Sequence, residues 1–558
     1  MIRRLFRMVG GKWQGMHEAA ILLGVFSLVS QLLGLVRDRM LAHTIGPSAT
    51  LDIYYAAFRV PDLIYLSIAS LASITVLMPF LIERLDGSGK EAARTFFNDV
   101  LSGFLFLLVI VSVGAFFLMP KIAHYIAPGF SPEDITKLVA VSRIMLISPI
   151  CMGLSNMLGT ITQLLRKFFV FSLSPIFYNV GLIIGIVWLY PRFGVYGLAW
   201  GVALGALLHL CIQLPTLFSA GFAPKLSRRL ERSTLRQVVT LSLPRTLGLS
   251  MNSISLLVIV ALGSTLGAGA ISIFNFSLNL ETVPVGIIGI SYAVASFPLL
   301  AETFARGQKE KWEECILSAI RQIIFWSLPL TALFIVLRAQ IVRVTLGSGA
   351  FSWADTRLTA AAFALFAVGL IAQNMILVSV RAFYSAHNTK TPLIINAFCS
   401  LFIIGGAYWL VHVFNTVPTF KYFIESLLRV EDTPGTVMLM LPLAYALGTI
   451  LNAWLHFIDL RKRYLTGVRS LQKTFLESSA AAVGMGVVSY FVLNLLAPIF
   501  STHTFWGIAM QGFWAGLAGV CTAVIILALL GSEPLFELVA ALKRKFWKVD
   551  LVTSETQE

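Results

Sequence analysis

Four charged residues near the start of the chain, set within strongly apolar sequence, are the first candidates for chemistry. Arg37 and Asp38 stand in one apolar run, and Asp52 and Arg59 lie two helical turns apart in the next, so they share one helix face. A charge at the bilayer centre costs ~2.5 kcal/mol or more, so each of them needs a partner or a role. Arginine holds phosphate oxygens through paired N–H bonds and stays charged. This pattern predicts an anion cavity for a phosphate or diphosphate headgroup.

A second interpretation of these residues needs no ligand. The four side chains would then pair with one another, or Arg37 and Arg39 would lie at the outer interface and reach into water. Arg245 adds a further candidate cation to the cavity, and Glu281 would offset part of its charge. These two residues can equally form a buried pair between helices. The basic residues that fall within or at the margins of apolar runs are Arg37, Arg39, Arg59, Arg143, Arg245 and Arg321.

The segments that carry these residues are typical of membrane-spanning helices. Of the 558 residues, 57% are apolar and 12% are charged, and the mean hydropathy is +0.84. A soluble domain has roughly 25% charged residues. A helix needs about 20 apolar residues to cross a bilayer. The sequence predicts an all-α integral membrane protein with about fourteen spans, at 17–44, 51–84, 94–119, 136–165, 168–190, 194–221, 235–264, 269–304, 314–338, 356–386, 391–414, 436–460, 474–499 and 503–531.

Little chain remains outside these spans, so we expect no soluble catalytic domain and no enzyme activity. The five cysteines are dispersed, and no His or Cys spacing is typical of a metal site, so we expect no metal and no cofactor. The net charge of +15 could indicate a nucleic-acid partner in a soluble protein. In a membrane protein it reflects basic loops on the cytoplasmic side, and we expect no nucleic acid.

The distribution of Lys and Arg predicts the orientation of the chain. Basic residues are concentrated in alternate loops, such as 84–94, 223–236 and 461–473. This pattern places both termini in the cytoplasm. The basic segment 1–16 precedes the first span, and 533–558 forms an amphipathic basic tail. The tail suits an interfacial helix on anionic membrane lipids.

The chain also contains an internal repeat. The segment Leu77–Glu83, with a proline as its third residue, matches Ser296–Glu302, and Ser174–Asn179 matches Thr391–Asn396 at nearly the same spacing. We therefore expect two parallel six-helix lobes, at 17–222 and 223–465, which enclose a cavity and alternate its access. The two spans at 466–532 are an addition to this plan.

Three separated motifs carry a resemblance to a known family. Residues 30–63 read SQLLGLVRDRMLAHTIGPSATLDIYYAAFRVPDL, residues 284–289 read PVGIIG before Phe297-Pro298, and Phe383-Tyr384-Ser385 precedes Thr389–Pro392. This pattern resembles the MurJ/MviN family, the lipid II flippases of the MOP exporter superfamily. The likeness covers essentially the whole chain, including the two lobes and the extra C-terminal pair of helices.

The resemblance implies a flippase in the bacterial cytoplasmic membrane. It would move undecaprenyl-diphosphate-linked peptidoglycan precursor, lipid II, from the inner to the outer leaflet for cell-wall biogenesis, without covalent chemistry. In the family the headgroup occupies a cationic cavity between the lobes, and the lipid tail lies by the last two helices, here 466–532. Cell-wall synthesis proteins are possible partners. By position, Arg37, Asp38, Asp52 and Arg59 match residues of the family signature.

Three departures from the family pattern leave alternatives open. Where the family usually carries arginine, this chain has Gln31, Tyr65 and Asn279. The candidate headgroup-binding set is Gln31, Arg37, Asp38, Asp52, Arg59, Arg245, Asn279 and Glu281. The chain would otherwise export another polyprenyl-linked glycan, or serve as a non-transporting scaffold of cell-wall assembly.

Overall fold

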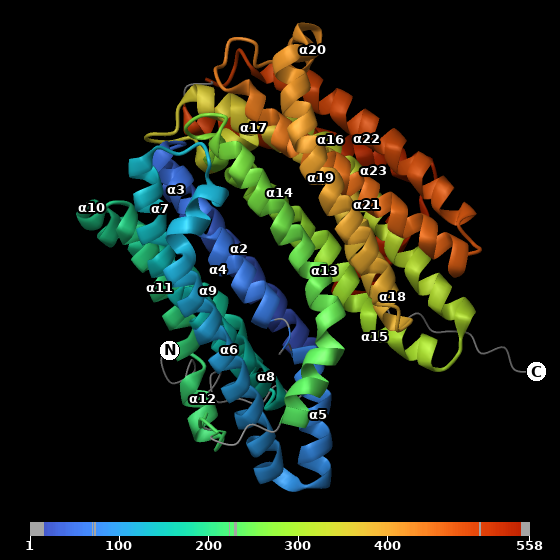
Figure 1. Cartoon of the computed structure of the whole chain (residues 1–558). Coiled ribbons are helices and arrows are strands. Elements are labelled where there is room, and N and C mark those ends of the chain that lie inside the picture. Colours follow the sequence, from blue (N-terminus) through green and yellow to red (C-terminus); the bar gives the residue numbers. More distant parts are fainter. Residues whose placement is uncertain are drawn as a thin grey trace, which may run out of the picture. The chain divides into compact units, whose positions relative to one another are not determined.

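A computed structural model of the chain describes residues 16–69, 71, 74–222, 224–227, 232–501 and 504–547 (Figure 1). Every regular element in these ranges is a helix. The first half contains α2 (Met16–Thr44), α3 (Ala49–Ala57), α4 (Arg59–Ile64), α5 (Ile74–Gly87), α6 (Gly89–Ile126), α7 (Pro132–Met145), α8 (Ile147–Leu164), α9 (Phe168–Ile184), α10 (Tyr190–Phe193), α11 (Val195–Cys211) and α12 (Leu214–Ser219).

The second half continues in the same way. It contains α13 (Arg232–Ser264), α14 (Ala270–Pro284), α15 (Ser291–Ala305), α16 (Lys309–Leu346), α17 (Trp353–Val368), α18 (Leu370–Ser385), α19 (Lys390–Thr416), α20 (Pro418–Leu428), α21 (Met440–Arg463), α22 (Arg469–Leu496), α23 (Phe505–Leu529) and α24 (Glu533–Trp547). Short π-helices η1 (Tyr65–Ala69), η2 (Gly185–Leu189) and η3 (Val285–Ile290) and the 3-10 helix η4 (Thr436–Leu439) interrupt the longer helices.

The predicted all-α membrane architecture is confirmed. Among the described residues, 11 helices are long and apolar enough to cross a membrane, or 12 if the bent pair α17 and α18 is one span. They correspond to the third to fourteenth predicted spans. The first prediction coincides with α2, and the second is divided among α3, α4, η1 and α5. The second is broken because it contains Asp52, Arg59, Pro61 and Asp62, and Pro61 lacks the N–H that a continuous helix requires. The number fourteen stays a prediction.

The chain forms two compact units that do not follow the linear order of the sequence. Unit 1 comprises residues 1–280, 345–362 and 389–448, and unit 2 comprises 281–344, 363–388 and 449–558. The predicted lobes at 17–222 and 223–465 and the additional pair at 466–532 therefore stay predictions. The segment 1–16 lies almost wholly outside the described residues. Of the predicted tail 533–558, the structure describes α24 and not the residues beyond 547.

Unit 1 is held together by closely packed helices. Helix α9 contacts α2 on one side and α11 on the other (Figure 1). At the crossing of α9 and α11, Gly181 faces Gly205, and a Cβ on Gly181 would lie 2.2 Å from the Cα of Gly205. Only glycine permits this approach of two backbones, which is a common way to pack helices in a membrane. The crossing fixes α9, whose polar face contacts α2.

Unit 2 contains the C-terminal helices. Helices α22 and α23 run side by side (Figure 1). The amphipathic helix α24 docks through Leu535, which packs with Phe325 and Leu527, while Phe536 and Val539 remain exposed. Arg321 of α16 donates to Glu533 at 3.1 Å. This ion pair with α24 accounts for one of the six basic residues within or beside the predicted spans.

Candidate functional site

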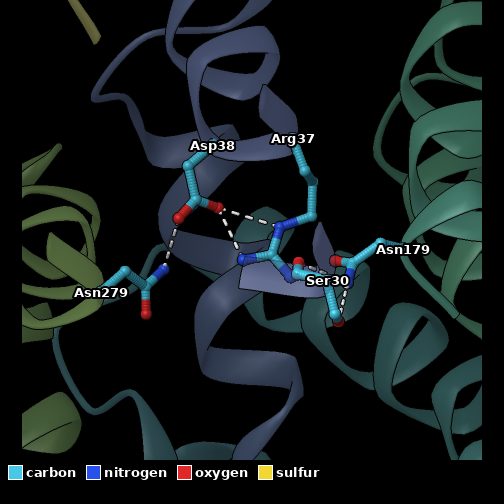
Figure 2. A network of polar contacts seen from close by, with 5 residues as sticks. All are labelled: Ser30, Arg37, Asp38, Asn179 and Asn279. Carbon is cyan, nitrogen blue, oxygen red and sulfur yellow. Dashed lines mark hydrogen bonds and ion pairs between the residues drawn. The ribbon is translucent and has the colours of Figure 1, made fainter. Parts of the chain in front are cut away.

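The end of α2 carries a neutralised arginine. Nε and Nη2 of Arg37 donate to Oδ1 of Asp38 at 2.9 and 2.7 Å. The other carboxylate oxygen of Asp38 accepts from Nδ2 of Asn279 at 2.9 Å. Figure 2 shows Arg37 and Asn279 approaching Asp38 from two sides. Asp38 is 3% exposed, and a buried carboxylate requires such partners because hydrocarbon offers it none.

A second polar contact fixes α2 against α9. Nδ2 of Asn179 donates to Oγ and the carbonyl of Ser30 at 3.2 and 3.3 Å, and to the carbonyl of Pro175 at 3.1 Å (Figure 2). Pro175 lies inside α9 and has no N–H, so the carbonyl of Phe171, four residues earlier, loses its helical donor. Asn179 bonds the carbonyl of Pro175 itself and, through Ser30, orients α2.

Asp52 binds the first turn of another helix. Its Oδ2 accepts from the backbone N–H of Gly269 at 2.6 Å, and its Oδ1 accepts from the N–H and the hydroxyl of Ser272 at 2.7 and 2.5 Å. The first N–H groups of a helix have no partner within the helix, and the positive end of the helix dipole favours an anion there. Asp52 thus joins α3 to the beginning of α14 within unit 1.

Further contacts gather at this same end of unit 1. The carbonyl of His43 accepts from Ala350 N–H at 2.9 Å, and Arg39 donates to the carbonyl of Thr345 at 3.3 Å. The N–H of Gly129 donates to Ser264 at 3.0 Å. Together with the bonds of Asp52, these contacts connect the end of α2, helix α3 and the loop before α7 to segments later in the sequence. This end of unit 1 is closed by polar contacts.

Of the two arginines among the four candidates, Arg59 has fewer hydrogen bonds to its guanidinium in the described residues than Arg37. Nη2 of Arg59 donates to Oδ1 of Asn275 at 2.6 Å. Its Nε is buried without a hydrogen-bond partner in the described part of the chain. A guanidinium has five N–H donors in a planar fork. Arg59 therefore retains donors for a ligand, and Asp62, one turn further along α4, supplies a nearby opposite charge.

These side chains surround a pocket of about 280 Å³ in unit 1. We call it the arginine pocket. It is lined by Arg37, Leu41, Tyr54, Tyr55, Phe58, Arg59, Asp62, Tyr178, Asn275, Leu278 and Asn279. The hydroxyl of Tyr55 is buried without a partner among the described residues. The lining offers hydrogen-bond donors, aromatic faces and two cations, which together suit a sugar-phosphate group.

The structure brings only part of the predicted set together. Arg37, Arg59 and Asn279 line the arginine pocket, and Asp38 lies behind Arg37. Asp52 and Gln31 are not among the lining residues. Asp52 closes one end of unit 1, and the Oε1 of Gln31 is buried without a partner within the described ranges.

Two predicted residues are placed elsewhere or not described. Glu281 belongs to unit 2 and is 1% exposed. With the amide of Gln373 oriented toward it, Gln373 donates to both oxygens of Glu281 at 2.6 and 3.1 Å. Arg245 lies in α13, and its side chain is outside the described residues, as is any pair with Glu281.

The lining includes residues that the sequence reasoning left out of the predicted site. Asp62, Asn275, Tyr54, Tyr55 and Tyr178 all face the arginine pocket. A signal existed for two of them, because Asn275 lies one helical turn before Asn279 and Asp62 nearly one turn after Arg59. Tyr178 comes from α9, and no spacing in the sequence connects it to α2 or α4. In the described residues, no group of three or more His, Cys, Asp or Glu could hold a metal ion.

Comparison with solved structures identifies the fold. A structure described as "Lipid II flippase MurJ, inward closed conformation" aligns with a TM-score of 0.71 at 19% identity, over 93% of this chain and 100% of that chain. An inward-facing multidrug resistance MATE family transporter of the MOP superfamily aligns with a TM-score of 0.63 at 18% identity, over 82% and 99% of the two chains. The chain therefore has the same fold as these two proteins.

The sequence comparisons define the family more narrowly. The family described as "Lipid II flippase MurJ" matches residues 41–510. A probable lipid II flippase MurJ of Buchnera aphidicola subsp. Acyrthosiphon pisum is 25% identical over 519 residues, 92% of this chain and 96% of the relative. The lipid II flippase MurJ of Burkholderia cenocepacia is 23% identical over 481 residues, 85% and 88% of the two chains. The chain belongs to the MurJ lipid II flippase family.

Proposed function

We propose that this chain is a flippase that moves lipid II from the inner to the outer leaflet of the bacterial cytoplasmic membrane. Membership of the family supports the activity, and the all-helical multi-pass fold supports a transport mechanism. A flippase lowers the barrier to crossing by keeping the charged headgroup out of hydrocarbon, so it requires a polar chamber and no covalent step. The arginine pocket is the candidate for this chamber.

The observation that carries the proposal is the state of Arg59. This guanidinium lies beside a hollow of about 280 Å³, its Nη2 bonds Asn275, and its Nε has no partner in the described residues. Arg321, which forms an ion pair with Glu533, also has a buried Nε without a partner in the described residues, so the feature that distinguishes Arg59 is the polar hollow beside its guanidinium. A diphosphate oxygen at the unused N–H groups would complete the bonding.

The charge balance of the arginine pocket indicates moderate affinity. Arg37 is paired with Asp38, and Asp62 shares the pocket with Arg59. Two cations are therefore offset by two carboxylates. A headgroup that is bound too tightly would be released slowly on the far side of the membrane. A ligand shifts the protein from one conformation to another only by binding the two conformations with different affinity. Neutral donors such as Asn275, Asn279 and Tyr55 would then supply much of the contact to the glycan.

The end of unit 1 that Asp52 closes is, in our proposal, the outer end. The distribution of basic loops places the N-terminus inside, so α2 would run from the cytoplasm to the outer surface, where Thr44 and Asp52 would lie. Release to the outer leaflet then requires the bonds of Asp52 to Gly269 and Ser272 to break. In an alternating-access cycle, this contact would form when the outer end is closed and break when it opens.

The additional helices and the tail have roles in the same proposal. Helices α22 and α23, within the predicted segment 466–532, present exposed apolar side chains such as Val483, Phe491 and Ile525, and we assign the lipid tail to this surface. Lys543 of α24 is exposed, which suits anionic lipid at the cytoplasmic face. Cell-wall synthesis proteins would receive the flipped substrate.

A second candidate function is export of another polyprenyl-linked glycan. It is favoured by one observation, the near-neutral arginine pocket, in which Asn279 bonds Asp38 at a position that the family usually gives to arginine. Such a substrate would still carry a diphosphate at Arg59. The sugar that contacts Tyr54, Tyr55 and Tyr178 of the arginine pocket would then differ from that of lipid II.

Rescue of a flippase-depleted bacterium tests the proposal. The wild-type chain should restore growth and the appearance of lipid II at the outer leaflet, and Arg59→Ala should reduce that appearance by about a hundredfold, since a hydrogen bond to a charged group is worth ~1.5–3 kcal/mol. Arg192→Ala is the matched control, because Arg192 is exposed and its bond among the described residues is to the carbonyl of Trp188, in its own helical segment. Restored growth without lipid II at the outer leaflet would indicate a non-transporting scaffold. If the wild-type chain transported another polyprenyl-linked glycan but not lipid II, the second candidate would be supported.

A further inference from the structure

A second cavity lies in unit 2, between α15 and α16, and has no part in the proposed headgroup site. Its volume is about 480 Å³, which is within the range of small-molecule sites. We call it the α15–α16 cavity. Its central walls are formed by Ala295, Ser296 and Leu299 of α15 and by Cys315, Ser318 and Ala319 of α16.

The hollow follows from the register of the two helices. Helices α15 and α16 form a hairpin around Gly307, so residues equally distant from Gly307 lie opposite each other. Ala295 is then opposite Ala319, and Ser296 is opposite Ser318. Small side chains on both sides leave a groove that neither helix fills, and Ala295, Leu299 and Ser318 in its lining are exposed.

Polar side chains hold the helices apart at the end of the cavity farther from the turn. Tyr292 of α15 donates its hydroxyl to Gln322 of α16 at 3.4 Å, and Trp326 donates to the same hydroxyl at 3.2 Å. Gln322 also donates to Glu537 of α24 at 3.0 Å. This network closes one end of the cavity with bonded groups and prevents the small residues from coming into direct contact.

The dimensions of the cavity fit one chain of a membrane lipid. Its lining extends along α15 from Tyr292 to Thr303 and along α16 from Lys311 to Gln322. At 1.5 Å per residue each wall is about 16 Å long. This is close to half of the ~30 Å hydrocarbon core of a bilayer, the depth that the chains of one leaflet occupy. A straight apolar chain fills such a slot better than a compact polar solute.

The mouth of the cavity carries one charge of each sign. Lys311 and Glu314, one turn apart at the start of α16, line the cavity and are exposed. Neither forms an ion pair with another described residue. A headgroup with a phosphate and an ammonium matches this pair. A diphosphate would meet one lysine and be repelled by Glu314, so the pair disfavours the polyprenyl substrate.

We propose that the α15–α16 cavity binds an acyl chain of a zwitterionic aminophospholipid, whose phosphate contacts Lys311 and whose ammonium contacts Glu314. The bound lipid fills the gap between the two helices and supports their hairpin. This site differs from the surface of α22 and α23 that we assign to the tail of the transported lipid.

Native mass spectrometry of the purified full-length chain tests the site. The protein is incubated with equal amounts of phosphatidylethanolamine, phosphatidylglycerol and undecaprenyl diphosphate, and the retained lipid is identified. We expect one phosphatidylethanolamine, retained about fivefold above phosphatidylglycerol, and loss of about fivefold in Ala295→Trp, whose indole occupies the slot. Val294→Trp is the matched control, because Val294 and Ala295 are both exposed on α15 and only Ala295 lines the cavity.

A second variant keeps the cavity and changes only its mouth. Glu314→Lys should shift the preference from phosphatidylethanolamine to phosphatidylglycerol, since two cations favour a net anionic headgroup. Unlike Ala295→Trp, this variant adds no bulk inside the cavity, so the result does not depend on a substitution that could disturb the packing of α15 and α16. Equal retention of phosphatidylethanolamine by the wild type and Ala295→Trp would overturn the proposal. So would selective retention of undecaprenyl diphosphate that Ala295→Trp abolishes and Val294→Trp does not.

Discussion

The two halves of the chain share a local design and use it differently. The π-helix η1 follows α4 in the first half, and η3 follows α14 in the second. Each is preceded by a carboxylate, Asp62 in the first case and Glu281 in the second. Asp62 is exposed at the arginine pocket, whereas Glu281 is 1% exposed and accepts both N–H groups of the Gln373 amide.

This difference shows what makes a buried charge available for function. A π-helix widens a helical turn and is frequent at functional sites. Next to η1, charged groups of both signs line an open pocket and retain unused hydrogen-bonding capacity. Next to η3, a neutral amide satisfies the carboxylate completely. The same break in a helix therefore lies beside an open polar pocket in unit 1 and beside a closed polar contact in unit 2.

The largest effect is expected when the contact between α3 and the beginning of α14 is removed. Asp52→Ala leaves the N–H groups of Gly269 and Ser272 without their acceptor. Each unsatisfied buried group costs about 1–3 kcal/mol, so we expect transport in the rescue assay to fall about a hundredfold and the thermal transition of the purified protein to move down by several degrees.

Asp355→Ala is the matched control for Asp52→Ala. Asp355 also accepts from a backbone N–H and a hydroxyl, both of Ser352, at 2.8 and 2.7 Å, but at a solvent-exposed helix start. Water can replace its bonds, so the loss should be about 1 kcal/mol or less. Equal effects of the two substitutions would show that the bonds of Asp52 have no special role in the transport cycle.

The sequence was sufficient for the architecture but not for the environment of each charge. Apolar runs, basic loops and proline positions predict helices and spans because these signals are local. The pairing of Arg37 with Asp38 was open to both interpretations, since adjacent residues can contact each other or diverge. The bond from Asp52 to α14 could not be predicted, because it depends on where the second half of the chain folds against the first.

An effect of intermediate size is expected when Asp62, the acid before η1, is neutralised. Asp62→Asn removes a carboxylate from the arginine pocket and leaves Arg59 as a less compensated cation, so we expect purified protein to bind undecaprenyl diphosphate about tenfold more tightly, a change of ~1.4 kcal/mol. Unchanged or weaker binding would show that Asp62 does not act on the ligand. The measurement is a direct titration in detergent at low salt, where screening of the charges is small.

The smallest effect is expected from the equivalent change in the second half. Glu281→Gln keeps a carbonyl oxygen that accepts from Gln373, so binding of undecaprenyl diphosphate and transport in the rescue assay should each change by less than about twofold. A tenfold loss of transport would contradict this assignment and give Glu281 a direct part in the cycle. Measured under the same conditions, Asp62→Asn and Glu281→Gln show whether the acid near η1 or the acid near η3 affects the ligand.

The pocket residues show where sequence reasoning reaches its limit. Asn275 and Asp62 stand about one turn from predicted site residues, so helical spacing could have indicated them although the prediction omitted them. Tyr178 comes from a helix that no motif connects to the site, and its position depends on the glycine crossing that brings α9 close to its neighbours. Packing between distant segments is therefore the part of the site that local patterns do not contain.

Binding of lipid II to the purified full-length chain tests whether the arginine pocket is the headgroup site. We expect Arg59→Ala to weaken binding by at least about tenfold, or ~1.4 kcal/mol, and Arg192→Ala to leave it unchanged, with both variants folded by thermal melting. Equal affinity of the wild type and Arg59→Ala would contradict the assignment of the headgroup to this pocket.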